Sequence, residues 1–444
     1  MSKMKYSGVE WIGDIPEFWE TKRLRYLLTE IKVGPFGSAL SGDDIKTSGI
    51  YWVYNQRCVL DENFVTNDTF VDENKFKELK TFEVKKNDIL LTTRGTIGKV
   101  AIVPNEFPKG IIHPCLIRFK INEKLINTKL LKLIFNCSDL IQKQLNYKSN
   151  STTIEVIYSY NLKDIFLPII PQQEQKLITN FLYEKTLVLD DILFDLNREI
   201  EILNNYKRGL ITEKVTENNK YTIDVQNGKI NLNFENKSKI VRIKNVLNGI
   251  TDGTHGTFDR VYNGEYLLSA KNVFEVGLKI GENESMISYK DYKDIIKCGY
   301  PKKNDLLMCC VGTVGRTMVY KENKPFAFQR SVLFMRVDNN KILPEFLNYS
   351  MNSNYMLEQE KVLVNKSAQD GIYQGTVKNM YLYLPALNKQ KEIVDYLDKK
   401  CEQIDKIIEE KQKQIQKIEE YKKSVIYEYV TGKKRVEGAE ELYG

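Results

Sequence analysis

The chain of 444 residues contains a long internal repeat, which constrains its architecture more than any other feature of the sequence. Val84–Lys99 (VKKNDILLTTRGTIGK) recurs 217 positions later as Pro301–Arg316 (PKKNDLLMCCVGTVGR). Further along each half, Gln175–Leu182 (QKLITNFL) is matched by Gln390–Leu397 (QKEIVDYL). Solenoid repeats run roughly 20–50 residues, so this much longer period indicates a duplicated module. A chain built in this way would do a similar thing at two places.

Each half is predicted to be an α+β domain followed by a long helix. Short runs of β-branched and aromatic residues, bounded by Gly, Asn, Asp and Pro, indicate strands. Gln172–Val215 then continues with Gly209 as its only glycine or proline. Residues 216–240 are polar and predict a connector with a hairpin-like insertion. The predicted division is 1–172 and 217–385 for two α+β domains, 173–216 and 386–430 for two long helices, and 431–444 for a charged, mobile tail.

Both long segments carry a heptad seam, with apolar residues three and four positions apart. Neither helix is apolar all round, so each needs a partner, and the other copy is the closest candidate. An antiparallel pair would place the domains at opposite ends, related by a pseudo-twofold axis. The alternative is two separate helices that dock on other proteins. The predicted seam residues are Leu189, Leu193, Leu196, Ile200, Leu203, Leu210, Ile404, Ile408, Ile415, Ile418 and Val425, and Lys411 takes the place that corresponds to Leu196.

Net charge, cysteine and histidine content and the lengths of apolar runs limit which partners and sites the chain can have. The formal net charge of +7 weakly favours a polyanionic partner, since net charge bears on association and not on fold. Seven Cys and two His are present without a CxxC pair, so the sequence predicts reduced thiols and no metal site. No apolar run approaches the roughly 18 residues of a membrane span. We expect a soluble, cytoplasmic protein without a membrane partner.

The duplicated motif is predicted to form a hairpin with two tight turns. Most of its positions are expected to be scaffold. Four glycines are expected at positive φ, namely Gly95, Gly98, Gly312 and Gly315. The exceptions are three cations at strand ends that are able to reach phosphate: Arg94, Lys99 and Arg316.

Two loops of small polar residues occupy equivalent places in the two halves and would suit a DNA groove. They are Gly34–Leu40 (GPFGSAL) and Asp252–Thr257 (DGTHGT), and neither has P-loop spacing. Asn, Gln and Arg side chains at nearby strand ends are the types that read adenine and guanine edges. The plainer interpretation of each is an ordinary solvated loop. The candidate DNA-binding residues are Ser38, Asn55, Gln56, Arg57, Arg94, Lys99, Ser151, Thr152, Thr153, Thr254, His255, Lys271, Asn272, Arg316, Gln329, Arg330, Gln369 and Gln374.

The motifs of catalysis are absent from the sequence. It has no G-x-S-x-G, HExxH or Walker A, and no Asn/Asp-Pro-Pro-aromatic tetrapeptide of the amino-methyltransferases. We therefore predict no catalytic site. Two other classes stay open at this point. One is a stand-alone DNA-modifying enzyme, which an S-adenosylmethionine binding assay would test, and the other is a coiled-coil adaptor without DNA recognition.

The order of these motifs resembles the specificity subunit of type I restriction-modification systems over nearly the whole chain. SGVEWIGDIPEFW near the start, GPFGSAL, DGTH, the paired KKND…GT hairpins and the Leu-Pro…Gln entry into each long helix carry the resemblance. The second half lacks a clear copy of SGVEWIGDIP. The resemblance implies two target recognition domains, each of which reads one half of a bipartite, asymmetric DNA target.

The resemblance also implies the partners. The two helices would set the gap between half-sites and dock two methyltransferase subunits, which carry S-adenosylmethionine and flip and methylate adenine. Where restriction subunits exist, two of them would join and bring ATP and magnesium. This chain would then bind double-stranded DNA and no cofactor, and it would supply specificity and assembly for bacterial defence without chemistry of its own.

Overall fold

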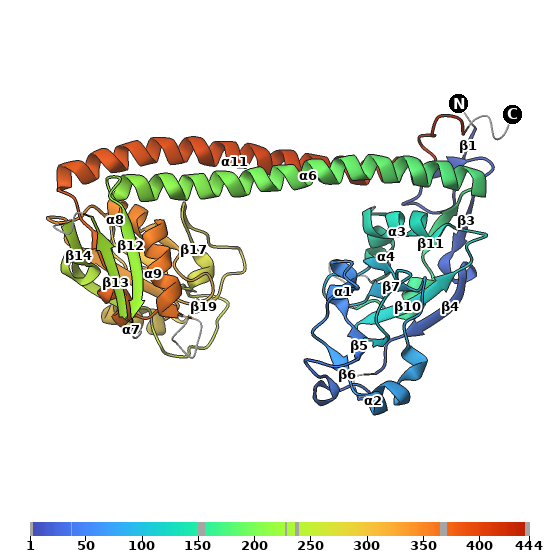
Figure 1. The fold of residues 1–444 in the computed structure, drawn as a ribbon, viewed down its shortest axis with the longest axis horizontal. Helices are drawn as coiled ribbons and strands as arrows, with labels where there is room; N and C mark the ends of the chain where they lie inside the picture. Colours follow the sequence, from blue (N-terminus) through green and yellow to red (C-terminus); the bar gives the residue numbers. More distant parts are fainter. Residues whose placement is uncertain are drawn as a thin grey trace. The chain divides into compact units, whose positions relative to one another are not determined.

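The structure is a computed structural model that describes residues 3–36, 38–137, 139–149, 156–226, 229–235, 239–364 and 371–439. Its contacts divide the chain into two compact units (Figure 1). Unit 1 comprises Met1–Leu196 and Lys413–Gly444, and unit 2 comprises Asn197–Gln412. Packing therefore divides the molecule differently from chain order, because each long helix contributes one part to each unit.

Two small sheets form the α+β domain of unit 1. The central sheet is antiparallel with the strand order β4-β10-β7-β8, and a second sheet has the order β6-β5-β9, with β5 and β9 parallel. Strands β1 and β2 pair with each other, as do β3 and β11. The bounds are β1 Met4–Tyr6, β2 Asp14–Pro16, β3 Glu20–Arg23, β4 Leu28–Val33, β5 Tyr51–Tyr54, α1 Gln56–Leu60, β6 Phe70–Val71, α2 Glu73–Glu78, β7 Ile89–Thr92, β8 Val100–Ile102, β9 Gly110–Ile112, β10 Leu116–Ile121, α3 Thr128–Cys137, α4 Leu140–Ser149, α5 Ser159–Lys163, β11 Phe166–Ile169 and α6 Gln172–Val215.

Unit 2 repeats this plan. Its central sheet has the order β15-β23-β20-β21, and its second sheet has the order β19-β16-β22, again with one parallel pair. The hairpin β12–β13 lies in the connector, where the sequence predicts a hairpin-like insertion. The bounds are β12 Tyr221–Gln226, β13 Lys229–Phe234, β14 Ile240–Arg242, β15 Leu247–Asp252, β16 Glu265–Leu268, β17 Val273–Phe274, β18 Gly277–Leu278, β19 Met286–Ile287, α7 Tyr289–Cys298, β20 Leu306–Cys309, β21 Thr317–Val319, β22 Ala327–Phe328, β23 Val332–Val337, α8 Pro344–Met351, α9 Asn354–Val364, α10 Gln374–Asn379, β24 Tyr381–Tyr383 and α11 Leu387–Val430. The predicted α+β fold class with two domains and two long helices is confirmed.

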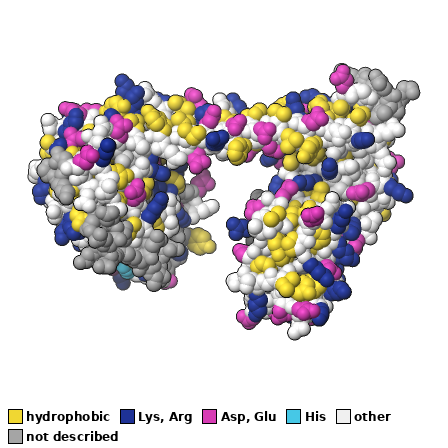
Figure 2. All heavy atoms as spheres, viewed as in Figure 1, with side chains coloured by type: hydrophobic (Ala, Val, Ile, Leu, Met, Phe, Trp, Pro, Cys, Tyr) yellow, Lys and Arg dark blue, Asp and Glu magenta, His cyan; other side chains and the backbone are white. Residues whose placement is uncertain are grey.

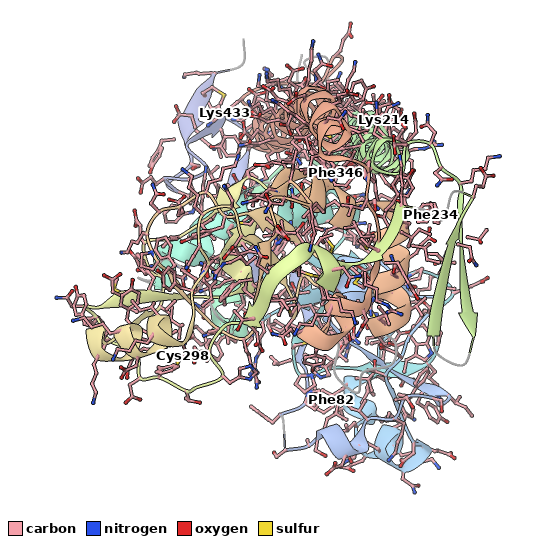
Figure 3. All side chains as sticks on the ribbon, turned by 90° about the vertical axis from the view of Figure 1, so that its left-hand side faces the viewer. Phe82, Lys214, Phe234, Cys298, Phe346 and Lys433 are labelled. Carbon is pink, nitrogen blue, oxygen red and sulfur yellow. The ribbon has the colours of Figure 1, made fainter. Side chains whose placement is uncertain are left out.

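Strands β7 and β20 of the central sheets carry apolar residues on both faces because each face is covered. In β7, Ile89 and Leu91 pack with the helices, whereas Leu90 packs with the second sheet. This is the period-two alternation of a strand buried on both sides. In unit 2 the core also takes in Phe234 of β13 and Phe346 of α8, both fully buried (Figure 3).

In each unit, the aspartate of the duplicated KKND sequence is buried and pairs with an arginine of the neighbouring central strand. The carboxylate of Asp88 accepts the backbone N–H of Lys85 at 2.6 Å and pairs with Arg118 at 3.2 Å. Asp305 likewise pairs with Arg336 at 2.9 Å. The preceding residue, Asn87, has a φ of +61°, which Asn tolerates better than most residues. The motif is therefore scaffold, as expected, and its four glycines all have positive φ.

One buried glutamine near the start of each long helix binds the backbone of the preceding turn. Gln175 accepts the backbone N–H of Asn127 at 2.7 Å and donates to the carbonyls of Leu125 and Ile170. Gln390 makes the same three kinds of contact at the start of α11. The Leu-Pro…Gln signature thus has a structural cause, because an amide satisfies donors and acceptors that the turn would leave unpaired.

The two long helices pair in opposite directions within each unit. In unit 1, Lys422 contacts Asp190 at 2.6 Å, and in unit 2, Lys207 contacts Asp405 at 2.7 Å. These pairs are equivalent, since each residue corresponds to its counterpart 215 positions later. All the predicted seam residues are buried or half-buried. Lys411 is half-buried in the seam and pairs with Glu199.

The end of the chain packs on its beginning. The buried Glu174 accepts a hydrogen bond from Trp19 Nε1 at 2.9 Å and an ion pair from Arg435 at 2.8 Å. Gly432 lies against Pro16, and Thr431 is fully buried. We call Trp19, Glu174 and Arg435 the terminal clasp. The sequence predicts a mobile tail from residue 431, whereas residues 431–439 are held in place by these contacts.

Candidate nucleic-acid interface

The loops that carry most candidate residues meet at one edge of each unit. In unit 1, β4 and β7 both run antiparallel to β10, and β5 is parallel to β9. The carboxyl ends of β4 and β7 therefore share one edge of the central sheet, and those of β5 and β9 share one edge of the second sheet. In unit 2 the same holds for β15, β20, β16 and β22. We call this set of strand ends the loop edge.

At the loop edge, a glycine in each unit allows the backbones of the two sheets to approach closely. A Cβ added at Gly34, directly after β4, would overlap the carbonyl oxygen of His113, directly after β9. A Cβ added at Gly253, after β15, would overlap the carbonyl oxygen of Gln329, after β22. Only glycine permits so close an approach of two backbones. The two Gly-containing loops that the sequence predicts to be equivalent therefore have the same anchor in both units.

Several predicted residues of unit 1 are accessible at this edge. Ser38, Arg57 and Arg94 are exposed, and Gln56 is half-buried beside Gly95. Arg57 lies 3.5 Å from Asp61. The Arg94 guanidinium makes no hydrogen bond or ion pair with any other residue in the described ranges. Arg94 is therefore available to a phosphate.

Unit 2 presents a different set at the same edge. His255 is exposed, and its Nε2 lies 2.6 Å from the Asp252 carboxylate. Lys271 is exposed and pairs with Glu284 at 2.9 Å. Arg330 is exposed and, within the described part of the chain, its side chain has no hydrogen bond or ion pair. Thr254 and Gln329 are half-buried and joined by a backbone bridge.

Five other candidates are occupied by contacts inside their own unit. Asn55 caps α1, and its Oδ1 accepts the backbone N–H groups of Arg57 and Cys58. Asn272 is buried and bonds Lys279 and Glu284. These side chains complete turns, as Asn commonly does. The remaining three bind backbone carbonyls: Lys99 that of Asn136 at 2.6 Å, Arg316 that of Ala270 at 3.0 Å, and Gln374 that of Ile250 at 2.6 Å.

Four further candidates, Ser151, Thr152, Thr153 and Gln369, lie outside the described residues. Sequence reasoning missed a group of exposed aromatic side chains at the loop edge. Phe36 is 87% exposed at the tip of the loop after β4. Tyr158 stacks on Tyr160 beside Arg94, and Tyr373 is the counterpart of Tyr158 at the start of α10. An aromatic residue next to Gly and Pro in a polar loop is a signal that could have found Phe36.

Acidic side chains lie beside the candidate residues of the loop edge: Asp61 beside Arg57, Asp252 beside His255 and Glu284 beside Lys271. On the face drawn in Figure 2, Lys and Arg side chains are interspersed with acidic ones. Burial, and to a lesser extent the Arg94 guanidinium, lower the pKa of His113. That imidazole is therefore neutral at physiological pH, whereas the neighbouring Arg94 is charged. Interspersed charges favour local contacts over a continuous basic stripe.

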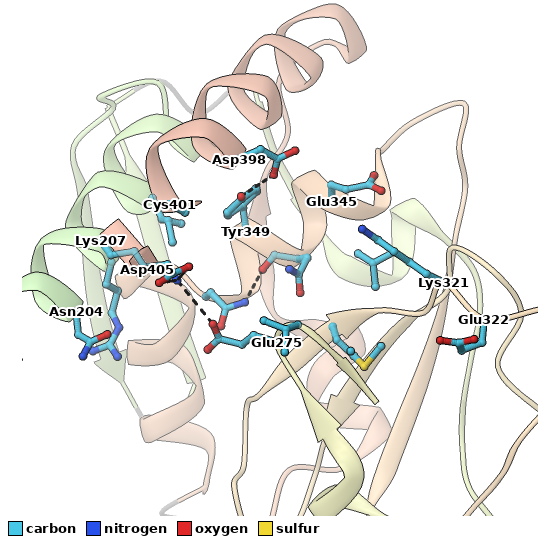
Figure 4. Close-up of a pocket in the computed structure, with 18 residues that line it drawn as sticks. Asn204, Lys207, Glu275, Lys321, Glu322, Glu345, Tyr349, Asp398, Cys401 and Asp405 are labelled. Atoms are coloured by element: carbon cyan, nitrogen blue, oxygen red, sulfur yellow. Dashed lines mark hydrogen bonds and ion pairs between the residues drawn. The ribbon is translucent and has the colours of Figure 1, made fainter. Parts of the chain in front are cut away.

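A separate cleft of about 600 Å³ lies in unit 2, between the paired helices, α8 and the β17–β18 hairpin (Figure 4). Its wall includes Lys207, which contacts Asp405, and Tyr349, which donates to Asp398 at 2.7 Å. Carboxylates also line it at Glu275, Glu322 and Glu345. These carboxylates would repel the negatively charged phosphate backbone of DNA. We therefore place the candidate nucleic-acid interface at the loop edge.

The described residues hold no group of three side chains placed to bind a metal ion. Among the described helices, none is both long enough and apolar enough to cross a membrane. Burial raises the pKa of the Cys58, Cys115 and Cys309 thiols. A raised pKa leaves a thiol protonated and a poor nucleophile.

A family model for the type I restriction modification DNA specificity domain matches residues 16–202 and again residues 197–420. The two matches span most of the chain, so the chain belongs to this family. They also reproduce the internal duplication.

Relatives and a solved structure agree with this assignment. The type I restriction enzyme EcoBI specificity subunit of Escherichia coli is 23% identical over 59% of this chain, and the match spans 57% of that protein. The MjaVIII specificity subunit of Methanocaldococcus jannaschii is 25% identical over 95% of this chain and 94% of its own length. A solved structure concerned with complex assembly and conformational transition of the type I R-M system has a TM-score of 0.59 at 16% identity, over 94% of this chain and 98% of that chain. That likeness supports the fold.

Proposed function

We propose that this chain binds double-stranded DNA as the specificity subunit of a type I restriction-modification complex. Each unit reads one half of a bipartite target through its loop edge. The two loop edges carry different residues, so the two half-sites differ and the target is asymmetric. The single observation that carries the proposal is a duplicated scaffold with divergent loop edges. Asp88 and Asp305 do the same structural work, whereas Phe36 and His255 occupy one equivalent position with different chemistry.

The exposed arginines supply the contacts that position DNA without reading its sequence. Arg94 and Arg330 lie at the loop edges of units 1 and 2 and are exposed. Contacts of this kind go to phosphate and make affinity depend on salt. Among the described candidates, the side chains of Gln56, Gln329 and His255 keep donors or acceptors that suit base edges.

The long helices link the two units and provide the assembly surface. Each helix spans 44 residues. Ion pairs join α6 to α11 in both units, next to the apolar seam. We propose that helix length sets the gap between half-sites and that two methyltransferase subunits dock on the helices, joined by two restriction subunits where these exist. S-adenosylmethionine belongs to the methyltransferase subunits, and ATP and magnesium to the restriction subunits. This chain works in the cytoplasm, binds no cofactor and performs no chemistry.

The test is methylation-sensitive sequencing of DNA from cells that express this chain with its modification subunit. We expect N6-methyladenine at one split, asymmetric motif, and none when this chain is omitted. The matched variants insert seven residues into both α6 and α11, which preserves the heptad seam. They should change the gap and leave both half-sites intact. Altered half-site letters, or no motif from a soluble and associated complex, would overturn the proposal and favour an adaptor.

A further inference from the structure

Two positions at the loop edge differ between the units as a linked pair. Val33 ends β4 and pairs with Ile117, and Asp252 ends β15 and pairs with Leu333, which makes Val33 and Asp252 equivalent by register. Three residues further on, the equivalent loop tips are Phe36 and His255. Unit 1 thus has two apolar residues where unit 2 has an acid and an imidazole.

The backbone that leads into Phe36 is buried, whereas the Phe36 side chain is exposed. Gly34 and Pro35 are buried, and the backbone N–H of Ala39 bonds the carbonyl of Phe36 at 2.8 Å. The ring itself is 87% exposed, and Val33 is 43% exposed. A large apolar group held out by an anchored loop is costly to leave in water and gains most from an apolar partner.

In unit 2 the equivalent residues, Asp252 and His255, contact each other, and the exposed imidazole can still bond a partner. His255 Nε2 lies 2.6 Å from Asp252 Oδ2, so the ring is oriented by the carboxylate. The imidazole side chain is 65% exposed. Its second nitrogen has no hydrogen bond to any residue in the described ranges.

We infer that this pair of positions determines which base each unit accepts, an inference that rests on the proposed DNA-binding function. Val33 and Phe36 of unit 1 form an apolar contact with the 5-methyl group of a thymine. Asp252 and His255 of unit 2 instead make a hydrogen bond to a base edge. In the major groove, the thymine methyl is the one apolar group that marks a base, and Phe is among the side chains that contact it. Hydrogen-bonding readout would leave the Phe36 ring unused.

The experiment measures binding of the full chain, purified with its modification subunit, to the motif found by methylation sequencing. Thymines in both half-sites are replaced one at a time by deoxyuridine, which removes only the methyl group. We expect one thymine at which uracil weakens binding about fourfold, the effect of one lost methyl contact. Phe36→Ala should bind the thymine target more weakly and no longer distinguish it from uracil. Ile50→Ala is the matched control, since Ile50 is 81% exposed at the opposite end of β5.

Reciprocal exchange tests both units. The Val33→Asp/Phe36→His variant should lose the thymine preference at one position of the unit 1 half-site and leave the other half-site unchanged. Asp252→Val/His255→Phe should alter only the unit 2 half-site, with Tyr262→Ala as its control. Equal binding of thymine and uracil at every position, or a target without thymine in the unit 1 half-site, would overturn the inference. A wild-type complex that recognises no motif would instead overturn the proposed function.

Discussion

Units 1 and 2 are built on the same buried groups and differ where side chains face outward. Asp88 and Asp305 are equivalent, and each pairs with an arginine of the neighbouring strand, although Arg118 and Arg336 lie at different register positions. The equivalent buried glutamines Gln144 and Gln359 bind the same backbone position in each unit. The loop edges share their glycine anchors but not their side chains. Groups that close a hydrogen-bonding network stay fixed because an unpaired buried partner is costly. Contact groups carry no such constraint, so the two units can recognise different partners on one scaffold.

The largest effect is expected from breaking the buried ion pair of unit 1. Arg118→Met leaves Asp88 buried with its main cation removed and should destabilise unit 1 by about 4 kcal/mol. Arg336→Met should cost clearly less, because the Arg336 side chain is 43% exposed and that of Arg118 is 3% exposed. Hydrogen exchange in β7 and β20 measures the two losses separately. Equal losses would show that burial does not set the strength of this pair.

Glu360 in unit 2 takes the place of Leu145 in unit 1 and gives the next largest effect. Its Oε1 has no hydrogen-bond partner among the described residues, and burial raises its pKa to about 7. The folded state therefore holds a proton that the unfolded state has released between about pH 4.5 and pH 7. Stability of unit 2 should fall by about 3 kcal/mol as pH rises through this window.

Glu360→Leu should remove this pH dependence and stabilise unit 2 at pH 8. Hydrogen exchange in β20 at pH 5 and pH 8, corrected for the intrinsic exchange rate, provides the measurement. Unit 1 serves as the internal control, because Leu145 does not titrate. A variant that keeps the wild-type pH profile would assign the dependence to another group.

The terminal clasp belongs to unit 1 alone and should contribute less. Arg435→Met leaves Glu174 with its hydrogen bond from Trp19, so the expected loss is about 2 kcal/mol. The equivalent of Glu174 in unit 2 is the exposed Lys389, and Lys389→Met should have no measurable effect. Limited proteolysis of the N-terminal segment would report the opening of the clasp. Cleavage at the wild-type rate in Arg435→Met would contradict its role.

The smallest effects are expected from the interhelical lysines. Lys207→Met and Lys422→Met remove equivalent pairs with partly exposed carboxylates, so each should cost at most about 1 kcal/mol. The two losses should be similar because the two pairs have the same burial. Hydrogen exchange in the helices tests this symmetry. A much larger loss at Lys207 would indicate that its second contact, with Glu275 at 3.9 Å, matters as well.

Much of the fold could be predicted from local pattern. Apolar residues three and four positions apart predicted the seam, including Leu189 and Ile404, because residues at that spacing lie on one face of a helix. The glycines of the hairpins were predicted for the same kind of reason, since a tight turn needs positive φ. The candidate interface was predicted less well. Lys99 and Arg94 both lie in one short turn of the same motif, yet one binds a carbonyl of α3 and the other is exposed.

The sequence by itself determined the duplication, the α+β class and the paired helices, and it predicted the loops of the candidate interface. The duplication follows from comparing the two halves of the chain, and the class and the helices follow from periodicity and residue type over neighbouring positions. The tertiary structure alone decided which polar groups remain free, that residues 431–439 close on the N-terminal segment, and that Phe36 and His255 are equivalent. Each of these depends on a partner far away in the chain, such as Asn136 for Lys99 or Glu174 for Arg435. A hydrogen bond consumes a side chain only where folding brings its partner within about 3 Å, and local sequence does not specify that distance.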